Sequence, residues 1–347
     1  MALSLPRLRR VFTQIQSGGF RAINNSSGTW TNTGAKLLRA GENAFRITPN
    51  MPINPVPVLT GTRSMAPGVR GRRNASWSMQ SVPVIPSGTA GTAPDMDHIF
   101  QNIFGQSGTV VASTSVTYSF LDTGFVPLTI LDFLNGQSSN TQKLIWGAFV
   151  SQFVLEFNQN FMTCSANGFG GFTLDSDNFS SEDTTAKAGL TEYPTIPGSP
   201  TTAGNPIAGF GGSATFDSQS IEAKIRSMRI TINTGFDMIG DVFSDAYGVQ
   251  AVAGARRVSV QLGVVDDDSA ALIDLKQKAK SATAPTINGS VTVGTVAGSR
   301  MTVNLNAIQL ITPELADNST YVMANFPEAD AHATAVGNVD DCTIAFT

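Results

Sequence analysis

Short runs of aromatic and β-branched residues, each ending near glycine, asparagine or aspartate, recur along most of the chain after residue 113. The first three are "TSVTYSFLD", "PLTILDFLN" and "WGAFVSQFVLEFN". Side chains of these types suit the pleated, half-buried surface of a strand, and the polar residues between the runs suit turns. The pattern therefore predicts a mainly β fold (α+β) with many short strands.

The second half of the chain shows a clearer alternation. "RRVSVQLGVV" places Ser259, Gln261 and Gly263 opposite an apolar face formed by Val258, Val260, Leu262 and Val264. "GSVTVGTVA" and "SRMTVNLNAIQL" predict two more strands, with the apolar residues Val291, Val293, Met301, Val303 and Leu305. Their other face holds uncharged polar residues: Thr292, Thr302, Asn304 and Asn306. Period-two alternation of this kind predicts strands with one buried face and one polar face.

Two segments predict helices instead. In "PDMDHIFQNIFG" the apolar residues Met96, Ile99, Phe100, Ile103 and Phe104 follow the helical period, and Gly105 ends it. We expect His98 in this helix to be half-exposed and structural. In "DDDSAALIDLKQKAK", Asp266, Asp267 and Asp268 precede the helix, and Lys276, Lys278 and Lys280 lie near its end. Both charge groups complement the helix dipole.

Charge is scarce and unevenly placed. Charged residues make up 14% of the 347 residues, and the formal net charge is −4. Residues 1–80 contain 11 of the 22 Lys and Arg but one acid, Glu42, a balance of +10; the remainder balances at −14. Such asymmetry indicates a basic segment for nucleic acid or for an acidic partner. Another copy of the same chain is one such partner.

The sequence offers little material for catalysis. It has two cysteines, Cys164 and Cys342, and two histidines, His98 and His332, without metal-ligand spacing. The glycine-rich "GFGG" stretches lack the pattern of a phosphate loop, and no nucleophile motif is present. We expect no enzyme, no cofactor and no metal. The longest apolar run, residues 144–155, is too short to span a bilayer, and no secretory signal is expected.

Two segments depart from the strand pattern. Residues 1–40 are predicted to be a flexible basic N-terminal arm, and residues 41–347 the folded domain. Within that domain, residues 176–212 have no usable period, which predicts a long inserted loop. "GFGGFTLDS" and "GFGGSATFDS" flank the loop and are either a short repeat or a coincidence.

The stretch "GVRGRRNASWSMQ" places Arg70, Arg72 and Arg73 within four positions. Such a cluster is typical of a nucleic-acid contact, but single-strand binders interleave arginines with exposed aromatic residues, and only Trp77 is near. The period instead predicts a turn into a strand that aligns Arg73 with Ala75, Trp77 and Met79. We therefore expect the arginines to contact an acidic neighbouring subunit.

Residues 49–105 resemble the N-terminal part of major tail tube proteins of long-tailed bacteriophages of the siphovirus type. The similarity lies in "LTGTRSMAPGVRGRRNASWSMQSVPVIPSGT", followed by the helix "PDMDHIFQNIFG". It continues in "QKLIWGAFVSQFVLEFNQNFMTCSA", "SIEAKIRSMRITINTGF" and "GARRVSVQLGVVDDDSAALIDL", and covers most of residues 49–346. These are patterns of turns and strands without a catalytic motif.

The resemblance implies a tail-tube β-sandwich or barrel with one or two packed helices. Six subunits would form a ring with a closed inner β-barrel, and stacked rings would form the conduit for DNA ejection. The protein would be a structural component of the virion tail, assembled in the host cytoplasm. Its partners would be itself, tape measure, terminator and tail tip proteins, and double-stranded DNA in transit, without stable membrane association.

The expected interface residues are Arg63, Arg70, Arg72, Arg73, Asp266, Asp267 and Asp268. A channel that lets DNA slide needs few cations in its wall. The expected lumen residues are therefore the uncharged Ser259, Gln261, Thr302, Asn304 and Asn306. The basic N-terminal segment is expected to bind acidic surfaces of adjacent subunits or of the next ring.

Three other functions remain open from the sequence. One is another virion component, such as a tail tip, baseplate or head protein. The second is a nucleic-acid-binding module that uses the basic N-terminal segment. The third is a glycan-binding or glycan-cleaving tail protein, for which no carboxylate pair stands out. Self-polymerisation of the purified protein distinguishes a tube from these alternatives.

Overall fold

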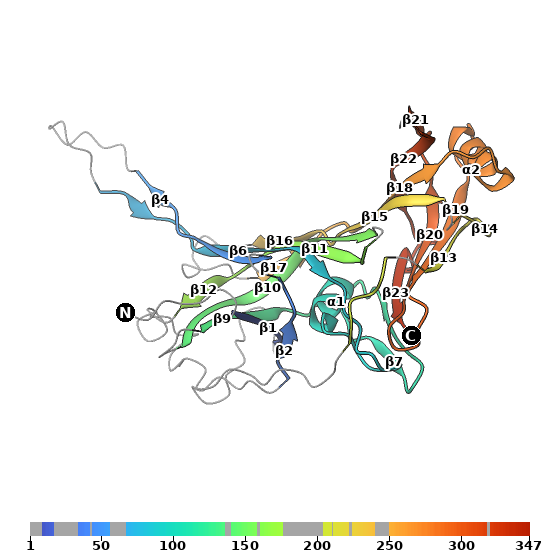
Figure 1. The fold of residues 1–347 in the computed structure, drawn as a ribbon. Coiled ribbons are helices and arrows are strands. Elements are labelled where there is room, and N and C mark those ends of the chain that lie inside the picture. The colour runs from blue at the N-terminus through green and yellow to red at the C-terminus, as the bar shows by residue number, and fades with distance from the viewer. Residues whose placement is uncertain are drawn as a thin grey trace.

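A branched antiparallel sheet and a smaller second sheet make up most of the computed structural model (Figure 1). The structure describes residues 9–16, 34–41, 44–55, 67–135, 140–157, 160–175, 204–209, 211–221, 224–239, 250–317 and 320–347. No helix in these ranges is long and apolar enough to cross a membrane.

Eight strands of the large sheet follow one another as antiparallel neighbours from one end of the molecule to the other. In spatial order they are β3 (Phe45–Asn50), β6 (Asn74–Pro83), β11 (Thr163–Gly170), β10 (Asn140–Phe157), β15 (Ile225–Asn233), β18 (Arg257–Val265), β22 (Val322–Ala331) and β21 (Glu314–Asp317). Figure 1 shows this path running from β6 to β21. We call it the eight-strand path.

The sheet branches at β10, the longest strand. Its C-terminal half pairs with β11 and β15, whereas its N-terminal half pairs with another set of strands. These are β9 (Leu128–Asn135), which continues into β1 (Arg10–Ile15) and β2 (Lys36–Leu38), and β12 (Phe172–Asp175). The register shifts between Ile145 and Ala148, around Gly147 with φ 58°, so β10 changes direction there.

The second sheet has seven strands. In spatial order they are β14 (Gln219–Ser220), β13 (Gly212–Phe216), β19 (Thr286–Val293), β20 (Met301–Gln309), β23 (Cys342–Phe346), β8 (Ser115–Ser119) and β7 (Thr109–Val111). Two separate ribbons are β4 (Ile53–Asn54) with β5 (Val69–Arg70), and β16 (Phe236–Ile239) with β17 (Gln250–Ala253). Figure 1 shows β4 projecting far from the sheets.

The predicted apolar faces form the shared core. Val258, Val260, Leu262 and Val264 of the large sheet are buried, as are Val291, Val293, Met301, Val303 and Leu305 of the seven-stranded sheet, and all belong to one hydrophobic cluster. The mainly β prediction is confirmed. In the described part of the chain neither sheet closes into a barrel.

Both predicted helices are confirmed. Helix α1 (Asp97–Phe104) ends at Gly105, whose φ of 76° is left-handed and whose N–H donates to Gln101 O. The prediction that His98 is half-exposed is wrong, because this residue is buried under strand β1. Helix α2 (Ala270–Lys280) follows the three aspartates and has Lys278 and Lys280 in its last turn.

The prediction of a free N-terminal arm is wrong for Arg10–Ile15 and Lys36–Leu38, which are strands of the large sheet. Strand β1 lies between two clusters: Val11 packs in the shared core, and Phe12 meets Phe133 edge-on at 5.7 Å. A strand buried on both faces has no period-two alternation, so its sequence lacks the expected signal. Residues 1–8 and 17–33 lie outside the described residues.

Most of the predicted 176–212 loop, residues 176–203 and 210, lies outside the described residues. Residues 204–209 are packed against the domain, since Ile207 is buried and its N–H donates to Val84 O at 3.1 Å. The two "GFGG" stretches do not occupy equivalent places. The first leads through β11 into β12 of the large sheet, and the second leads into β13 of the other sheet. Their similarity is a coincidence of glycine-led strand entries.

Candidate subunit interface

The eight-strand path ends in two edge strands. Within the described residues, β3 has one strand partner, β6, and β21 has one strand partner, β22. Figure 1 shows that the two ends of the path lie on opposite sides of the molecule. An edge strand presents unpaired backbone N–H and C=O groups, so it can extend the sheet into another chain.

The β3 edge is basic. Phe45 and Ile47 point into the core, whereas Arg46 and Thr48 are exposed on the other face. The β4–β5 ribbon continues from this edge and exposes the apolar residues Met51, Ile53 and Val69. Exposed apolar residues grouped at one place indicate a contact with another molecule.

The β21 edge is acidic. All four of its residues are exposed, including Glu314 and Asp317, and Leu315 between them is 63% exposed. The neighbouring Ile311 and Val322 are also exposed. The two ends of the path are thus complementary in charge, and each carries apolar residues that a partner would cover.

The predicted arginines lie around the ribbon rather than on the edge itself. Arg70 is exposed in β5, opposite Ile53, and Arg72 and Arg73 are half-buried where the chain enters β6. Arg63 lies outside the described residues. The predicted strand face is confirmed, because Ala75, Trp77 and Met79 are buried. Trp77 is 2% exposed and stacks on Phe45, so it offers no platform for a nucleic-acid base.

The three predicted aspartates have different environments. Asp266 accepts two hydrogen bonds from Lys276 Nζ, at 2.8 and 3.0 Å, within the same chain. Hydrogen bonds from Ser269 and the ammonium of Lys224 hold the pKa of Asp267 below its usual range. Asp268 is exposed and has a left-handed φ of 54°. Asp266 and Asp267 therefore stabilise the start of α2.

The predicted lumen residues fall on different sheets. Gln261 is exposed on the eight-strand path, but Ser259 beside it is 1% exposed, and its hydroxyl donates to Glu328. The prediction for Ser259 is therefore wrong. Thr302, Asn304 and Asn306 are half-buried on the seven-stranded sheet and bond to neighbours: Thr302 Oγ1 lies 2.9 Å from Thr292 Oγ1, Asn304 donates to Thr343, and Asn306 donates to Asp340 O. Since the two sheets cover opposite sides of one core, these two sets cannot line one surface.

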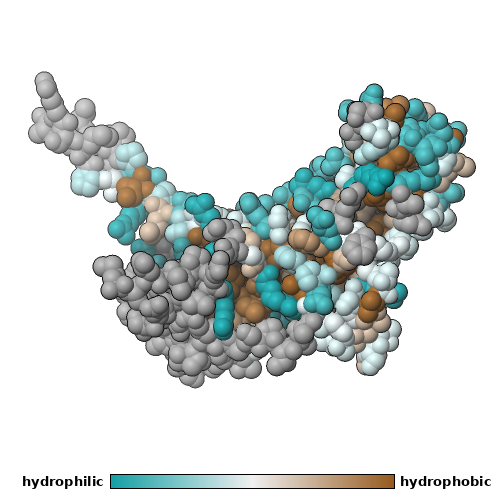
Figure 2. Space-filling view, viewed as in Figure 1, coloured by the Kyte–Doolittle hydropathy of each residue, from teal (hydrophilic) through white to brown (hydrophobic). Residues whose placement is uncertain are grey.

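The outward face of the eight-strand path carries mostly uncharged polar residues. Ser78, Asn167 and Gln152 stand opposite one another on three neighbouring strands, and Asn167 Nδ2 donates to Gln152 Oε1 at 3.2 Å. Gln261 lies further along the same path. Figure 2 shows mainly hydrophilic described residues along the hollowed upper side between the β4–β5 ribbon and α2.

The basic residues of the N-terminal segment bind acids of their own chain. Arg9 forms a two-pronged ion pair with Asp132, at 2.8 and 2.6 Å, and Arg39 pairs with Asp95. Lys36 Nζ lies 2.5 Å from Asp97 Oδ2, and Tyr118 OH donates to Asp97 Oδ1 at 2.6 Å. Burial alone would raise the pKa of Asp97, but these partners outweigh it and lower the pKa. These three cations are therefore paired within the chain, and the binding of this segment to adjacent subunits stays a prediction.

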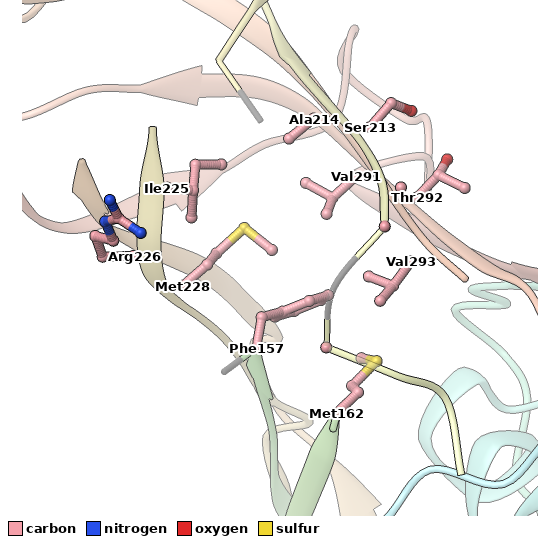
Figure 3. Close-up of a pocket in the computed structure, with 13 residues that line it drawn as sticks. Phe157, Met162, Ser213, Ala214, Ile225, Arg226, Met228, Val291, Thr292 and Val293 are labelled. Atoms are coloured by element: carbon pink, nitrogen blue, oxygen red, sulfur yellow. The ribbon is translucent and has the colours of Figure 1, made fainter. Parts of the chain in front are cut away.

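A pocket of about 330 Å³ separates the end of β10 from β13 and β19 (Figure 3). Phe157, Met228, Val291 and Val293 point toward one another across it. Arg226 is its single charged lining residue among those described, and the guanidinium lies 5.8 Å from the centre of the Tyr321 ring. No acid or histidine is among the described residues that line it.

The chain was compared with known proteins by two routes. No family model matches it, and no curated protein matches it.

Proposed function

We propose that this chain is the building block of a virion tail tube, in which chains join edge to edge into rings and the rings stack around a DNA channel. The observation that carries the proposal is the eight-strand path, with a polar outward face and two end strands of opposite charge that each have one strand partner among the described residues. The resemblance of residues 49–346 to tail tube proteins supports the same function.

The two edges favour a closed ring. A contact between different surfaces of identical chains repeats from chain to chain, and it closes when the rotation per chain divides a full turn. Closure of the sheet into a barrel leaves no edge strand exposed to uncontrolled pairing. Tape measure, terminator and tail tip proteins are the partners expected of such a tube.

The outward face of the eight-strand path is the better candidate for the channel wall. Gln261, Gln152, Asn167 and Ser78 lie on it, and their side chains are uncharged. Each cation that neutralises a phosphate adds affinity and would retard sliding DNA, so a wall with few cations suits transit. Arg46 and Arg229 are exposed on this face too, opposite Ser78 and Gln261. Thr302, Asn304 and Asn306 would then lie on the outside of the tube.

The purified protein is expected to form rings or hollow tubes visible by negative-stain microscopy. Leu315→Asp should prevent this assembly, because it places a charge on the exposed apolar β21 edge without disturbing the core. Val336→Asp, a fully exposed position in the loop after β22, is the matched control and should assemble normally. Monomers alone at high wild-type concentration would refute the proposal, and globular assemblies without a channel would favour another virion component.

A further inference from the structure

The eight-strand path consists of two halves with the same order of elements. The first half is β3-β6-β11-β10 and the second is β15-β18-β22-β21. In each half the chain runs through the first strand, a separate ribbon, the second strand, a helix and two strands of the seven-stranded sheet. It then forms the fourth and third strands in space, and in repeat 1 the strand β9 of the large sheet comes before them. We call residues 45–170 repeat 1 and residues 228–331 repeat 2.

The first two strands of each half pair in the same register, whereas β6–β11 and β18–β22 shift register at different places. In repeat 1, Phe45 pairs with Met79, and in repeat 2, Met228 pairs with Leu262. Each residue of the second pair lies 183 positions after its counterpart in the sequence, since 228 minus 45 and 262 minus 79 are both 183. The same spacing relates all six pairs, down to Asn50 with Asn74 and Asn233 with Arg257.

Corresponding paired residues of the two ribbons are also 183 positions apart. Ile53 pairs with Arg70 in the first ribbon, and Phe236 pairs with Ala253 in the second. A hydrogen bond closes the base of each: Gly71 N–H donates to Pro52 O at 2.7 Å, and Gly254 N–H donates to Gly235 O at 2.8 Å. The described parts of residues 45–83 and 228–266 thus share one arrangement of strand and ribbon pairing.

Several residues 183 positions apart in the two repeats are also identical. Arg46-Ile47-Thr48 and Asn50 correspond to Arg229-Ile230-Thr231 and Asn233. The corresponding pairs that follow are Gly71 and Gly254, Arg73 and Arg256, and Ser76 and Ser259. Identical residues at a constant spacing, in the same register, indicate that the chain contains an internal duplication.

The two repeats meet where β10 pairs with β15. Across this junction Glu156 stands opposite Arg229, and Val154 stands opposite Thr231. The counterpart of β15 is β3, and the counterpart of the C-terminal half of β10 is β21. These two counterparts are the end strands of the path, each with one strand partner in the described part of the chain.

We propose that β21 of one chain pairs with β3 of the next chain in the register of the β10–β15 junction. Each chain then supplies two equivalent units. This inference rests on the proposed function for its ring size: the six units expected in a tail tube ring come from three chains rather than six.

The correspondence is taken at the end of the strands marked by Pro83 and Asp266, because the register shifts of the two halves differ elsewhere. Glu156 pairs with Thr163, which pairs with Pro83. In repeat 2, Asp317 pairs with Val322. The Val322 carbonyl accepts a hydrogen bond from the N–H of Asp266, and Asp266 lies 183 positions after Pro83. Asp317 is therefore the counterpart of Glu156, and it should face Arg46 of the next chain.

Burial supports this register. Leu315 is the counterpart of Val154, which is 4% exposed inside the existing junction. In the separate chain Leu315 is 63% exposed. Pairing of β21 with β3 would place Leu315 opposite Thr48, as Val154 is opposite Thr231, and would cover it in the same way.

Engineered cysteines test the junction and the number of chains together. The double variant Arg46→Cys, Asp317→Cys should form disulfides between chains, because Cα atoms of opposed antiparallel residues lie within disulfide range. Both native cysteines are fully buried, which keeps background low. We expect a covalently closed species of three 36.5 kDa chains on non-reducing gels and in denaturing mass spectrometry. Arg46→Cys, Leu315→Cys, two residues out of register, is the matched control and should link at least tenfold less.

Charge reversal tests the predicted pair without a disulfide. Arg46→Glu and Asp317→Arg should each reduce assembly at least tenfold, and their combination in one chain should restore it, because the two residues meet between chains. Lys280→Glu, an exposed position at the end of α2, makes the same charge change as Arg46→Glu and should assemble normally. Circular dichroism melts of all variants verify folding.

The outcomes separate the two proposals. Tubes without the 46–317 link, or a closed species of six chains, would overturn the inference and leave the tail tube proposal standing. Linked three-chain rings that never stack would support the inference and count against the tube. Absence of both rings and link would overturn both.

Discussion

Gly168→Ala is expected to destabilise the fold by roughly 4 kcal/mol or more, a large part of the total stability of a typical domain. Gly168 lies in β11, between β6 and β10 of repeat 1, and stands opposite Trp77. An added Cβ would overlap the carbonyl oxygen of Phe149 and come within 2.8 Å of Trp77 Nε1. Neither neighbour can easily move, because Trp77 Nε1 donates to that carbonyl at 3.2 Å and the Trp77 ring stacks on Phe45.

Urea unfolding followed by tryptophan fluorescence would measure the effect, with circular dichroism as a second probe. Gly41→Ala is the matched control, because nothing lies within 4 Å of its added Cβ and its φ is not positive. We expect the control to change the free energy of unfolding by about 0.5 kcal/mol or less. A Gly168→Ala protein with wild-type stability would show that the β10–β11 contact is looser than described.

The local features of this fold were predictable from the sequence. Helix α1 has a helical apolar period and a terminal glycine, and β18 alternates strictly, so short-range pattern was enough for both. The mainly β class followed from many such segments. These are properties of neighbouring residues, which a single sequence displays directly.

Long-range pairing was not predictable in the same way. Strand β1 is buried on both faces and its flanking Arg9 pairs with Asp132, more than 100 residues away. Ser259 belongs to a polar strand face, yet Glu328 from β22 covers it. Burial of a polar face depends on which strand lies beside it, and local alternation does not encode that neighbour.

The internal duplication did leave a signal in the sequence. Arg46-Ile47-Thr48-x-Asn50 and Arg229-Ile230-Thr231-x-Asn233 are alike, but five-residue similarities arise by chance, as the two "GFGG" stretches show. The constant spacing of 183 residues through a ribbon and two paired strands is what distinguishes descent from coincidence. Arg46 and Asp317 become candidate interface residues only through that spacing.

Acid is expected to weaken the protein through His98, well before its carboxylates are protonated. Burial under strand β1, together with the ammonium of Lys36, lowers the pKa of His98 from 6.5 to about 4, although the nearby Asp97 opposes this. Because the Thr13 carbonyl lies 2.9 Å from Nδ1, the neutral ring donates its proton there. The folded state therefore prefers neutral imidazole, whereas the unfolded state takes up a proton near pH 6.5.

Between about pH 6.5 and about pH 4 the unfolded chain binds more protons than the folded chain, so the free energy of unfolding falls as the pH falls. The loss should approach about 3 kcal/mol. Asp97, whose pKa is also lowered, adds its own loss only below its usual value of 3.8. Urea titrations at several pH values would measure the slope. His98→Gln keeps a donor for Thr13 and should flatten this part of the profile, whereas the exposed His332→Gln should leave it unchanged. An unaltered slope in His98→Gln would assign the acid sensitivity to another group.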